Sequence, residues 1–273
     1  MRGTGRWADL SRRIVSAAVL LAVGVLLAMA EGIWLRLAMA GIIGITFWEL
    51  ARLTGWRHPD MHGTPFGRHR PVVLAVLAAA SVYAALNFLD GWPMLAVLLV
   101  PIIAGMPGAA DGNRWVLAVF GVAILLVGVG LVGFREVLGL PFVLWLMGIV
   151  ITSDILGYFA GKMIGGPKFW PRLSPKKTWS GTVAGWFGAL AVGAALVAGG
   201  IGDAALIWIS PLVAFAGQMG DIAESWLKRR AGVKDSSDLI PGHGGFMDRF
   251  DAITGATLAV MAIGLIATLP RVL

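Results

Sequence analysis

The chain has 273 residues, of which 58% are hydrophobic and only 14% are charged. Soluble globular domains carry about 25% charged residues, so this composition excludes a soluble domain. The chain has no cysteine, which excludes disulfides, thiolate catalysis and cysteine-based zinc sites.

Apolar segments recur from one end of the chain to the other, and most approach the 20 or so residues that cross a hydrocarbon core of roughly 30 Å. They predict an all-α polytopic integral membrane protein, because a helix satisfies its backbone groups within one segment. About nine transmembrane helices are expected, over residues 14–30, 33–50, 71–89, 93–106, 115–134, 141–161, 182–200, 204–223 and 252–269.

Basic residues decide the predicted orientation. The nine-helix arrangement places 19 of the 22 lysines and arginines on one side of the membrane and leaves Arg36, Arg135 and Arg271 on the other. Cytoplasmic loops are enriched in Lys and Arg, so the N-terminus is predicted to be cytoplasmic and the C-terminus outside. Because topology accounts for the net charge of +7, we expect no nucleic-acid partner.

The first apolar segment resembles a cleavable signal peptide, since Arg12 and Arg13 precede it and Ala28-Met29-Ala30 ends it. It is longer than the usual apolar region of about 7–15 residues, so we expect it to be retained as a helix. Residues 1–135 then form an N-terminal region of about five helices with few charges, suited to packing. Residues 136–273 form a region of about four helices with cytoplasmic loops, and its polar residues predict a catalytic role.

The sixth segment carries Asp154 in the inner third of the bilayer, with Tyr158 and Lys162 following on the same helix face. A charge within a membrane helix is costly, so Asp154 is a functional candidate, although a structural pairing with Lys162 is the alternative. The next loop contains Ser174, Lys176, Lys177 and Thr178 just before a helix start. Ammonium groups, hydroxyls and a helix N-terminus suit a phosphate, whereas topology alone could also explain the lysines.

The eighth segment ends in one polar stripe of Asp221, Glu224, Ser225 and Lys228. A solvated ion pair between Glu224 and Lys228 is the alternative to a functional role, but it does not explain Asp221.

A glycine turn then leads into the last segment, where Asp248 and Asp251 share one helix face. Gly242, Gly244 and Gly245 allow positive φ angles and close approach to a ligand. Carboxylate pairs on neighbouring helix ends are the oxygen ligands that Mg²⁺ prefers, with substrate phosphates completing its shell. His243 could be a metal ligand, a phosphate donor or a turn residue, and a site of this kind favours the phosphate contact.

Acids that bind a divalent ion and bases that bind phosphate oxygens are typical of active sites for phosphoryl or nucleotidyl transfer. A site at the inner membrane face suits a phospholipid and a cytosolic nucleotide as its two substrates. The main alternative is an ion-coupled transporter, whose polar residues should line a path across the bilayer instead of gathering at one face.

The segment from Ser225 to Asp251 resembles the diagnostic motif of the CDP-diacylglycerol synthase family, the phosphatidate cytidylyltransferases. That motif is S-x-apolar-K-R-x4-K-D, then P-x-H-G-G and D-R-x-D, and all its fixed positions are met. The resemblance extends to Asp154, Tyr158, the sequence SPKKTWSGT and Asp221. Family members usually have Glu where this chain has Ser180, so the role of that Glu is absent here or supplied by another acid.

This resemblance implies transfer of CMP from CTP to phosphatidic acid, with Mg²⁺ and a nearby K⁺, in a homodimer of a bacterial-type inner (plasma) membrane whose active site faces the cytoplasm. A related enzyme that uses a different lipid phosphate is an open alternative. The residues expected to take part in catalysis are Asp154, Asp221, Lys228, Asp248 and Arg249. Those expected to bind substrate are Tyr158, Ser174, Lys176, Lys177, Thr178, Ser225, Arg229, Lys234, Asp235, His243, Gly244 and Gly245, and the expected metal ligands are Asp221, Glu224, Asp248 and Asp251.

Overall fold

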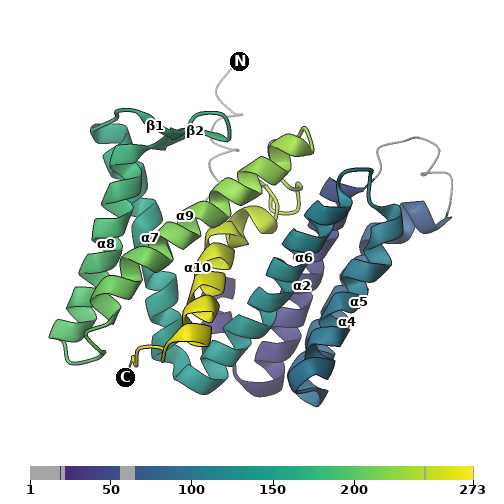
Figure 1. Cartoon of the computed structure of the whole chain (residues 1–273), viewed down its shortest axis with the longest axis horizontal. Coiled ribbons are helices and arrows are strands. Elements are labelled where there is room, and N and C mark those ends of the chain that lie inside the picture. Colours follow the sequence, from purple (N-terminus) through teal and green to yellow (C-terminus); the bar gives the residue numbers. More distant parts are fainter. Residues whose placement is uncertain (1–18, 20–21, 56–64, 243, 273) are drawn as a thin grey trace. The chain divides into compact units, whose positions relative to one another are not determined.

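The computed structural model describes residues 19, 22–55, 65–242 and 244–272. His243 and the start of the first predicted helix lie outside the described residues, so the retention of that helix stays a prediction. The long helices are α2 (Gly32–Thr54), α4 (Pro65–Phe88), α5 (Gly91–Gly105), α6 (Arg114–Gly133), α7 (Gly139–Met163), α8 (Trp179–Ala198), α9 (Leu206–Arg230) and α10 (Met247–Ile266) (Figure 1).

Each of these helices overlaps one of the predicted spans, which confirms an all-α polytopic membrane protein. By length and composition, seven helical segments of the described chain could cross a membrane, and one of them, Arg114–Met163, joins α6 and α7 through the π-helical turn η2 (Phe134–Leu138). A 3-10 turn, η1 (Met106–Gly108), follows α5. The exact number of spans and the side that faces the cytoplasm stay predictions.

The chain forms two compact units. One contains the chain up to Val129 together with Ala231–Arg249, and the other contains Gly130–Arg230 and Phe250–Leu273. The C-terminal motif segment is therefore split, because its loop belongs with the N-terminal helices while α9 and most of α10 belong to the second unit. The proposed boundary near residue 135 stays a prediction about domains.

In the first unit, α2 packs against α4 and α4 against α5. Its core is apolar and includes the fully buried side chains of Phe47, Leu50 and Leu74. Arg70, which directly precedes the predicted span 71–89, lies inside α4 and is only 5% exposed. Its guanidinium donates to the carbonyl oxygens of Ala51 at 2.8 Å and Gly105 at 2.9 Å, so it joins the C-terminal ends of α2 and α5.

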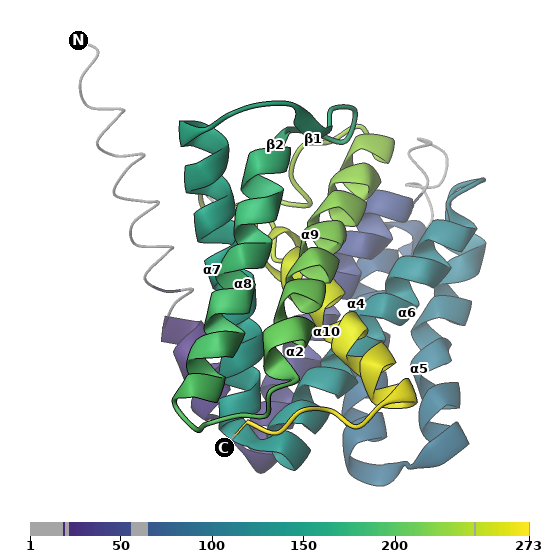
Figure 2. The ribbon, with the colours of Figure 1, turned by 60° about the vertical axis from the view of Figure 1, so that its left-hand side comes forward.

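In the second unit, α7, α8 and α9 lie side by side (Figure 2). Small residues allow this: a Cβ atom on Gly181 of α8 would collide with the carbonyl oxygen of Gly157 in α7. One feature departs from the all-helical expectation. Strands β1 (Lys168–Trp170) and β2 (Ser174–Thr178) form an antiparallel hairpin between α7 and α8, where the sequence predicted a loop.

Candidate active site

The site in the second unit is built where α9 and α10 cross. A Cβ atom on Gly220 would collide with the carbonyl oxygen of Asp251, and one on Gly255 would collide with the carbonyl oxygen of Ala216. The two backbones therefore touch, which only glycine permits at these positions. Asp221 follows Gly220 directly, and Asp251 lies one turn before Gly255, so the crossing places their carboxylates side by side.

Three acids gather at this crossing. One carboxylate oxygen from each of Asp221, Glu224 and Asp251 lies within 4.8 Å of the other two. Asp221 and Glu224 come from consecutive turns of α9, and Asp251 comes from the first turns of α10. Glu224 is buried at 3% exposure, whereas the other two are partly buried. The structure thus brings together three of the four predicted metal ligands.

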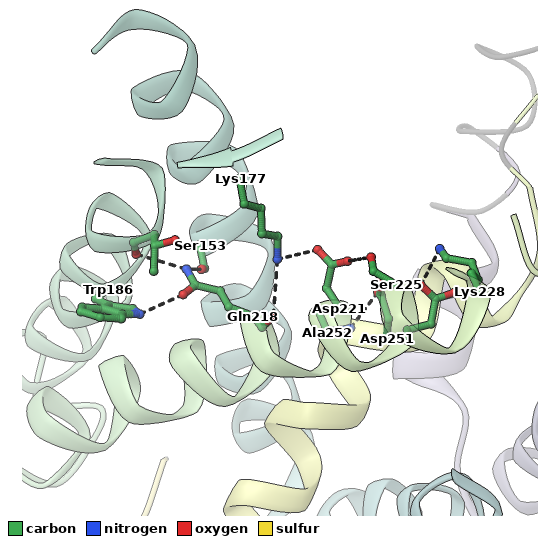
Figure 3. A network of polar contacts seen from close by, with 11 residues as sticks. Ser153, Lys177, Trp186, Gln218, Asp221, Ser225, Lys228, Asp251 and Ala252 are labelled. Carbon is green, nitrogen blue, oxygen red and sulfur yellow. Dashed lines mark hydrogen bonds and ion pairs between the residues drawn. The ribbon is translucent and has the colours of Figure 1, made fainter. Parts of the chain in front are cut away.

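Two lysines neutralise part of this negative charge. The ammonium group of Lys177 in β2 lies 2.5 Å from Asp221, and that of Lys228 lies 2.5 Å from Glu224 (Figure 3). The second pair is enclosed, with side-chain exposures of 12% for Lys228 and 4% for Glu224. The alternative of a solvated ion pair on a helix end is therefore wrong. An enclosed pair beside two further carboxylates is poised to exchange partners with a phosphate or a cation.

Asp154 joins the same constellation from α7. It lies close enough to Lys177 and Asp221 to interact with both electrostatically, and Asp251 interacts in turn with Asp221, Lys228 and Asp154. Tyr158 is 62% exposed on the same helix, and the ammonium group of Lys162 lies 5.7 Å from the centre of its ring. The predicted helix face of Asp154, Tyr158 and Lys162 is thus observed, with all three side chains exposed.

A buried polar network around Gln218 contacts Lys177. Its ammonium group donates to the backbone carbonyl of Gln218 at 3.5 Å. The Gln218 side chain donates to the Ser153 hydroxyl at 3.1 Å and the Thr182 carbonyl at 3.2 Å, and it accepts from the Trp186 indole at 2.9 Å. Figure 3 shows this amide between α7 and α8, one turn before Asp221. Sequence reasoning missed Gln218, although an amide within an apolar helix was a usable signal.

The other predicted substrate-binding residues of this unit lie on the hairpin and on α9. Lys176 is exposed and Ser174 partly buried in β2. The Thr178 hydroxyl caps α8 by accepting from the Gly181 N–H at 3.3 Å. Ser225 donates to Asp221 at 3.4 Å, and Arg229 is exposed.

Ser180, the position where family members usually have Glu, holds the hairpin to the end of α7. Its hydroxyl donates to the Gly165 carbonyl at 2.5 Å and lies 3.0 Å from the Thr178 hydroxyl.

In the first unit, the motif loop closes around Asp248. One oxygen of its carboxylate accepts from the Gly245 N–H at 2.7 Å, the Ser236 N–H at 3.0 Å and the Ser236 hydroxyl at 2.9 Å. Gly242 and Gly244 adopt φ angles of 77° and 82°, which confirms the predicted use of positive φ at these two positions but not at Gly245. Lys234, Asp235 and Arg249 are exposed around this loop.

Sequence analysis did not single out Glu49, which accepts hydrogen bonds from the motif loop. Glu49, in the last turns of α2, is 0% exposed. Its carboxylate accepts from the Ser237 hydroxyl, from the Phe246 N–H at 2.8 Å and from the Met247 N–H at 2.6 Å. An acid at the end of an apolar span was the available signal, since a charge there is costly unless it has a role.

The donor set at the helix crossing fits a divalent cation. Its members are carboxylate oxygens, which are hard ligands, and they converge on one point from two helices. One of them, Glu224, is buried, so its charge needs compensation, and Lys228 supplies part of it through their ion pair. Cysteine and histidine ligands, which softer metals favour, do not take part in this group.

Comparisons with known proteins agree with this chemistry. The model of a family described as the cytidylyltransferase family matches residues 11–267. The chain is 33% identical over 275 residues to a phosphatidate cytidylyltransferase of Brucella abortus biovar 1, covering 97% of each protein. It is 34% identical over 272 residues to a phosphatidate cytidylyltransferase of Pseudomonas aeruginosa, covering 90% of this chain and 94% of that protein. A protein of the same name from Staphylococcus aureus is 39% identical over 135 residues, 48% of this chain. The chain therefore belongs to the cytidylyltransferase family.

Proposed function

We propose that this protein is a phosphatidate cytidylyltransferase, which transfers CMP from CTP to phosphatidic acid and gives CDP-diacylglycerol and pyrophosphate for phospholipid biosynthesis. The match of the family model to almost the whole chain and the names of its relatives support this activity. The observation that carries the proposal is the cluster of three carboxylates and two lysines inside a polytopic membrane protein. Such a cluster suits phosphates at the membrane surface, where a lipid and a water-soluble nucleotide can meet.

The reaction needs positioning and charge neutralisation more than proton transfer. A phosphate oxygen of phosphatidic acid attacks the α-phosphorus of CTP, a new P–O bond forms, and the bond to the β-phosphate oxygen breaks in line with it. Pyrophosphate leaves with the electron pair of that bond. The attacking phosphate is already an anion near neutral pH, so no general base is required.

The lysines of the cluster are proposed to change partners during this reaction. Lys177 moves from Asp221 to the triphosphate, together with Lys176 and Arg249, while Lys228 and Arg229 bind the headgroup of phosphatidic acid. Ser174, Thr178, Ser225, Lys234, Asp235, His243 and the glycine turn are proposed to surround the phosphates, and Tyr158 is proposed to contact substrate beside Asp154. The role of His243 rests on the sequence motif alone, and each of the others rests on the motif together with the positions given above.

Asp221 and Asp248, assisted by Glu224 and Asp251, are proposed to hold Mg²⁺, with K⁺ as a second ion. When bound, Mg²⁺ would neutralise charge that develops on the phosphates and orient them. The proposed location is an inner (plasma) membrane of bacterial type, with the site facing the cytoplasm, and the resemblance to the family adds a homodimer as the proposed assembly.

Pyrophosphate release by the detergent-purified protein tests this function. Each nucleoside triphosphate is supplied in turn with Mg²⁺ and K⁺, in the presence and absence of phosphatidic acid, and the lipid product is identified by mass spectrometry. Release that requires both CTP and phosphatidic acid is expected. Release with another nucleotide or lipid would change the substrate, and folded protein without any release would contradict a transferase function.

A further inference from the structure

Glu49 is a buried carboxylate far from the acid cluster in the sequence. It lies in α2, within a stretch that sequence reasoning assigned to packing, and its side chain has no solvent exposure. A buried carboxylate is strongly destabilising unless hydrogen bonds compensate for its lost hydration. Its function must therefore be sought in the groups that it contacts.

Among the described residues, the donors to Glu49 come from one short stretch of the motif. One oxygen accepts from the Ser237 hydroxyl and the Phe246 N–H, and the other accepts from the Met247 N–H at 2.6 Å. Met247 is the first residue of α10, so these backbone N–H groups lie at a helix start, where they have no acceptor within the helix. The negative charge also suits the positive end of the helix dipole. Glu49 thus fixes where α10 begins.

A second carboxylate holds the same stretch from within. Asp248 accepts from Ser236 and from the Gly245 N–H, so the two ends of the loop, residues 236–237 and 245–247, are held by an acid on α2 and by an acid on α10. Gly245 lies between the two: a Cβ atom there would collide with the Ser236 hydroxyl and with the Glu49 carboxylate. The close approach that the motif glycine permits is therefore to the protein's own side chains.

From this geometry we infer that Glu49 is a positioning residue for the transferase, acting through the start of α10. It sets the position of Asp248 and Arg249, the residues that immediately follow the two amides it binds. The inference rests on the proposed function for its effect on catalysis, but its structural part can be measured without substrate or metal. It also gives the N-terminal helices a role in the reaction beyond membrane packing.

Three substitutions separate positioning from general stability. Glu49→Gln keeps the size of the side chain, but either orientation of its amide directs an NH₂ group at the backbone N–H of Phe246 or of Met247. Ser237→Ala removes one donor to Glu49, together with the acceptor of the Leu239 N–H, and leaves both backbone contacts with Glu49 in place. Thr46→Val, one turn earlier in α2, removes a buried hydroxyl that donates to the Ile42 carbonyl within its own helix. It is the matched control for loss of a buried polar group.

The first measurement is hydrogen exchange of residues 236–248 in the substrate-free protein. Glu49→Gln is expected to raise exchange there by about tenfold or more while α4 and α5 keep the wild-type rate. Ser237→Ala should leave this segment within about twofold of wild type except at Leu239, whose N–H loses its acceptor, and Thr46→Val should leave all of it within about twofold. The second measurement is steady-state kinetics. For Glu49→Gln, kcat should fall by about 10- to 100-fold, the range seen when a residue that orients functional groups is lost, with a smaller change in the KM for CTP.

Exchange of residues 236–248 that is unchanged in Glu49→Gln would overturn the inference, and so would raised exchange with wild-type kcat. An equal loss of kcat in Thr46→Val would also overturn it, because a stability effect would then suffice. If Glu49→Gln cannot be purified folded, Glu49→Asp replaces it, since it keeps both acceptor oxygens one methylene short and should show the same changes to a smaller extent. Absence of activity in the wild type would refute the proposed function. The exchange data would still test whether Glu49 holds the start of α10 in place.

Discussion

At the scale of single residues, the acid cluster is notable for the ammonium groups that already occupy it. Lys177 and Lys228 each lie 2.5 Å from a carboxylate, and the Lys228 pair is almost enclosed. A metal cation and a phosphate that bind together could replace both partners of these ion pairs. The cation would bind the carboxylates in place of the lysines, and the phosphate would bind the lysines in place of the carboxylates. The charge of the site would then stay balanced throughout binding.

Asp221 takes part in this exchange directly, because it contacts Lys177 and belongs to the group of three carboxylates. We expect Asp221→Asn to lower kcat by about 100-fold or more, which is the effect in other enzymes of losing one preorganised polar group that stabilises the transition state. The Mg²⁺ concentration that gives half-maximal activity of this variant should rise as well. Both are measured by initial rates at varied Mg²⁺. Asp238→Asn is the control, since Asp238 is an exposed acid of the motif loop and its loss should change neither value.

At the scale of elements, the crossing of α9 and α10 decides whether the carboxylates meet at all. Gly220 and Gly255 let the two backbones touch within one turn of Asp221 and Asp251. Helices that carry larger residues at a crossing stand 8–10 Å apart, which would separate carboxylates on short side chains. The site is therefore specified by two glycines as much as by its acids.

Gly255→Ala tests the crossing directly. The added methyl group would collide with the carbonyl oxygen of Ala216, so the helices must separate or the backbone must shift, at a cost of about 1–3 kcal/mol. We expect a lower thermal midpoint in detergent and a kcat reduced by about tenfold or more. Gly264→Ala, farther along α10, is the matched control. The nearest atoms to a Cβ atom there belong to the Leu269 side chain, at 3.4 Å, which is an ordinary contact distance, so activity should be retained. Equal losses in the two variants would argue against the crossing.

These elements differ in how far the sequence could predict them. The helices could be located because apolar length is a local property, and the stripe from Asp221 to Lys228 could be placed on one face because helical spacing is fixed. The β1–β2 hairpin was missed because Pro171, Pro175 and four basic residues are typical of an irregular loop. Glu49 was missed because its partners lie 188 to 198 residues away, and no local pattern reports such a contact.

At the scale of the whole molecule, the predicted orientation follows from the basic loops, and α8 offers a way to examine it. The helix has 20 residues, about 30 Å at 1.5 Å per residue, so its two ends can lie on opposite sides of a bilayer. The hairpin with its lysines precedes α8, and the short turn to α9 follows it (Figure 2). Because cytoplasmic loops are enriched in Lys and Arg, we predict that the hairpin faces the cytoplasm and the turn faces outside.

Single cysteines at these two ends test the orientation, because the chain has no cysteine of its own and each variant therefore carries one thiol. Lys168 in the hairpin and Ala204 in the turn are both exposed. In intact cells, a membrane-impermeant maleimide should label Ala204→Cys and spare Lys168→Cys, and after permeabilisation it should label both. The permeabilised sample controls for the reactivity of each thiol. Labelling of Lys168→Cys alone in intact cells would reverse the orientation and place the hairpin lysines, with the acid cluster beside Lys177, on the side away from cytosolic CTP. The proposed function would then lose its nucleotide supply, so this measurement links the topology of the molecule to its chemistry.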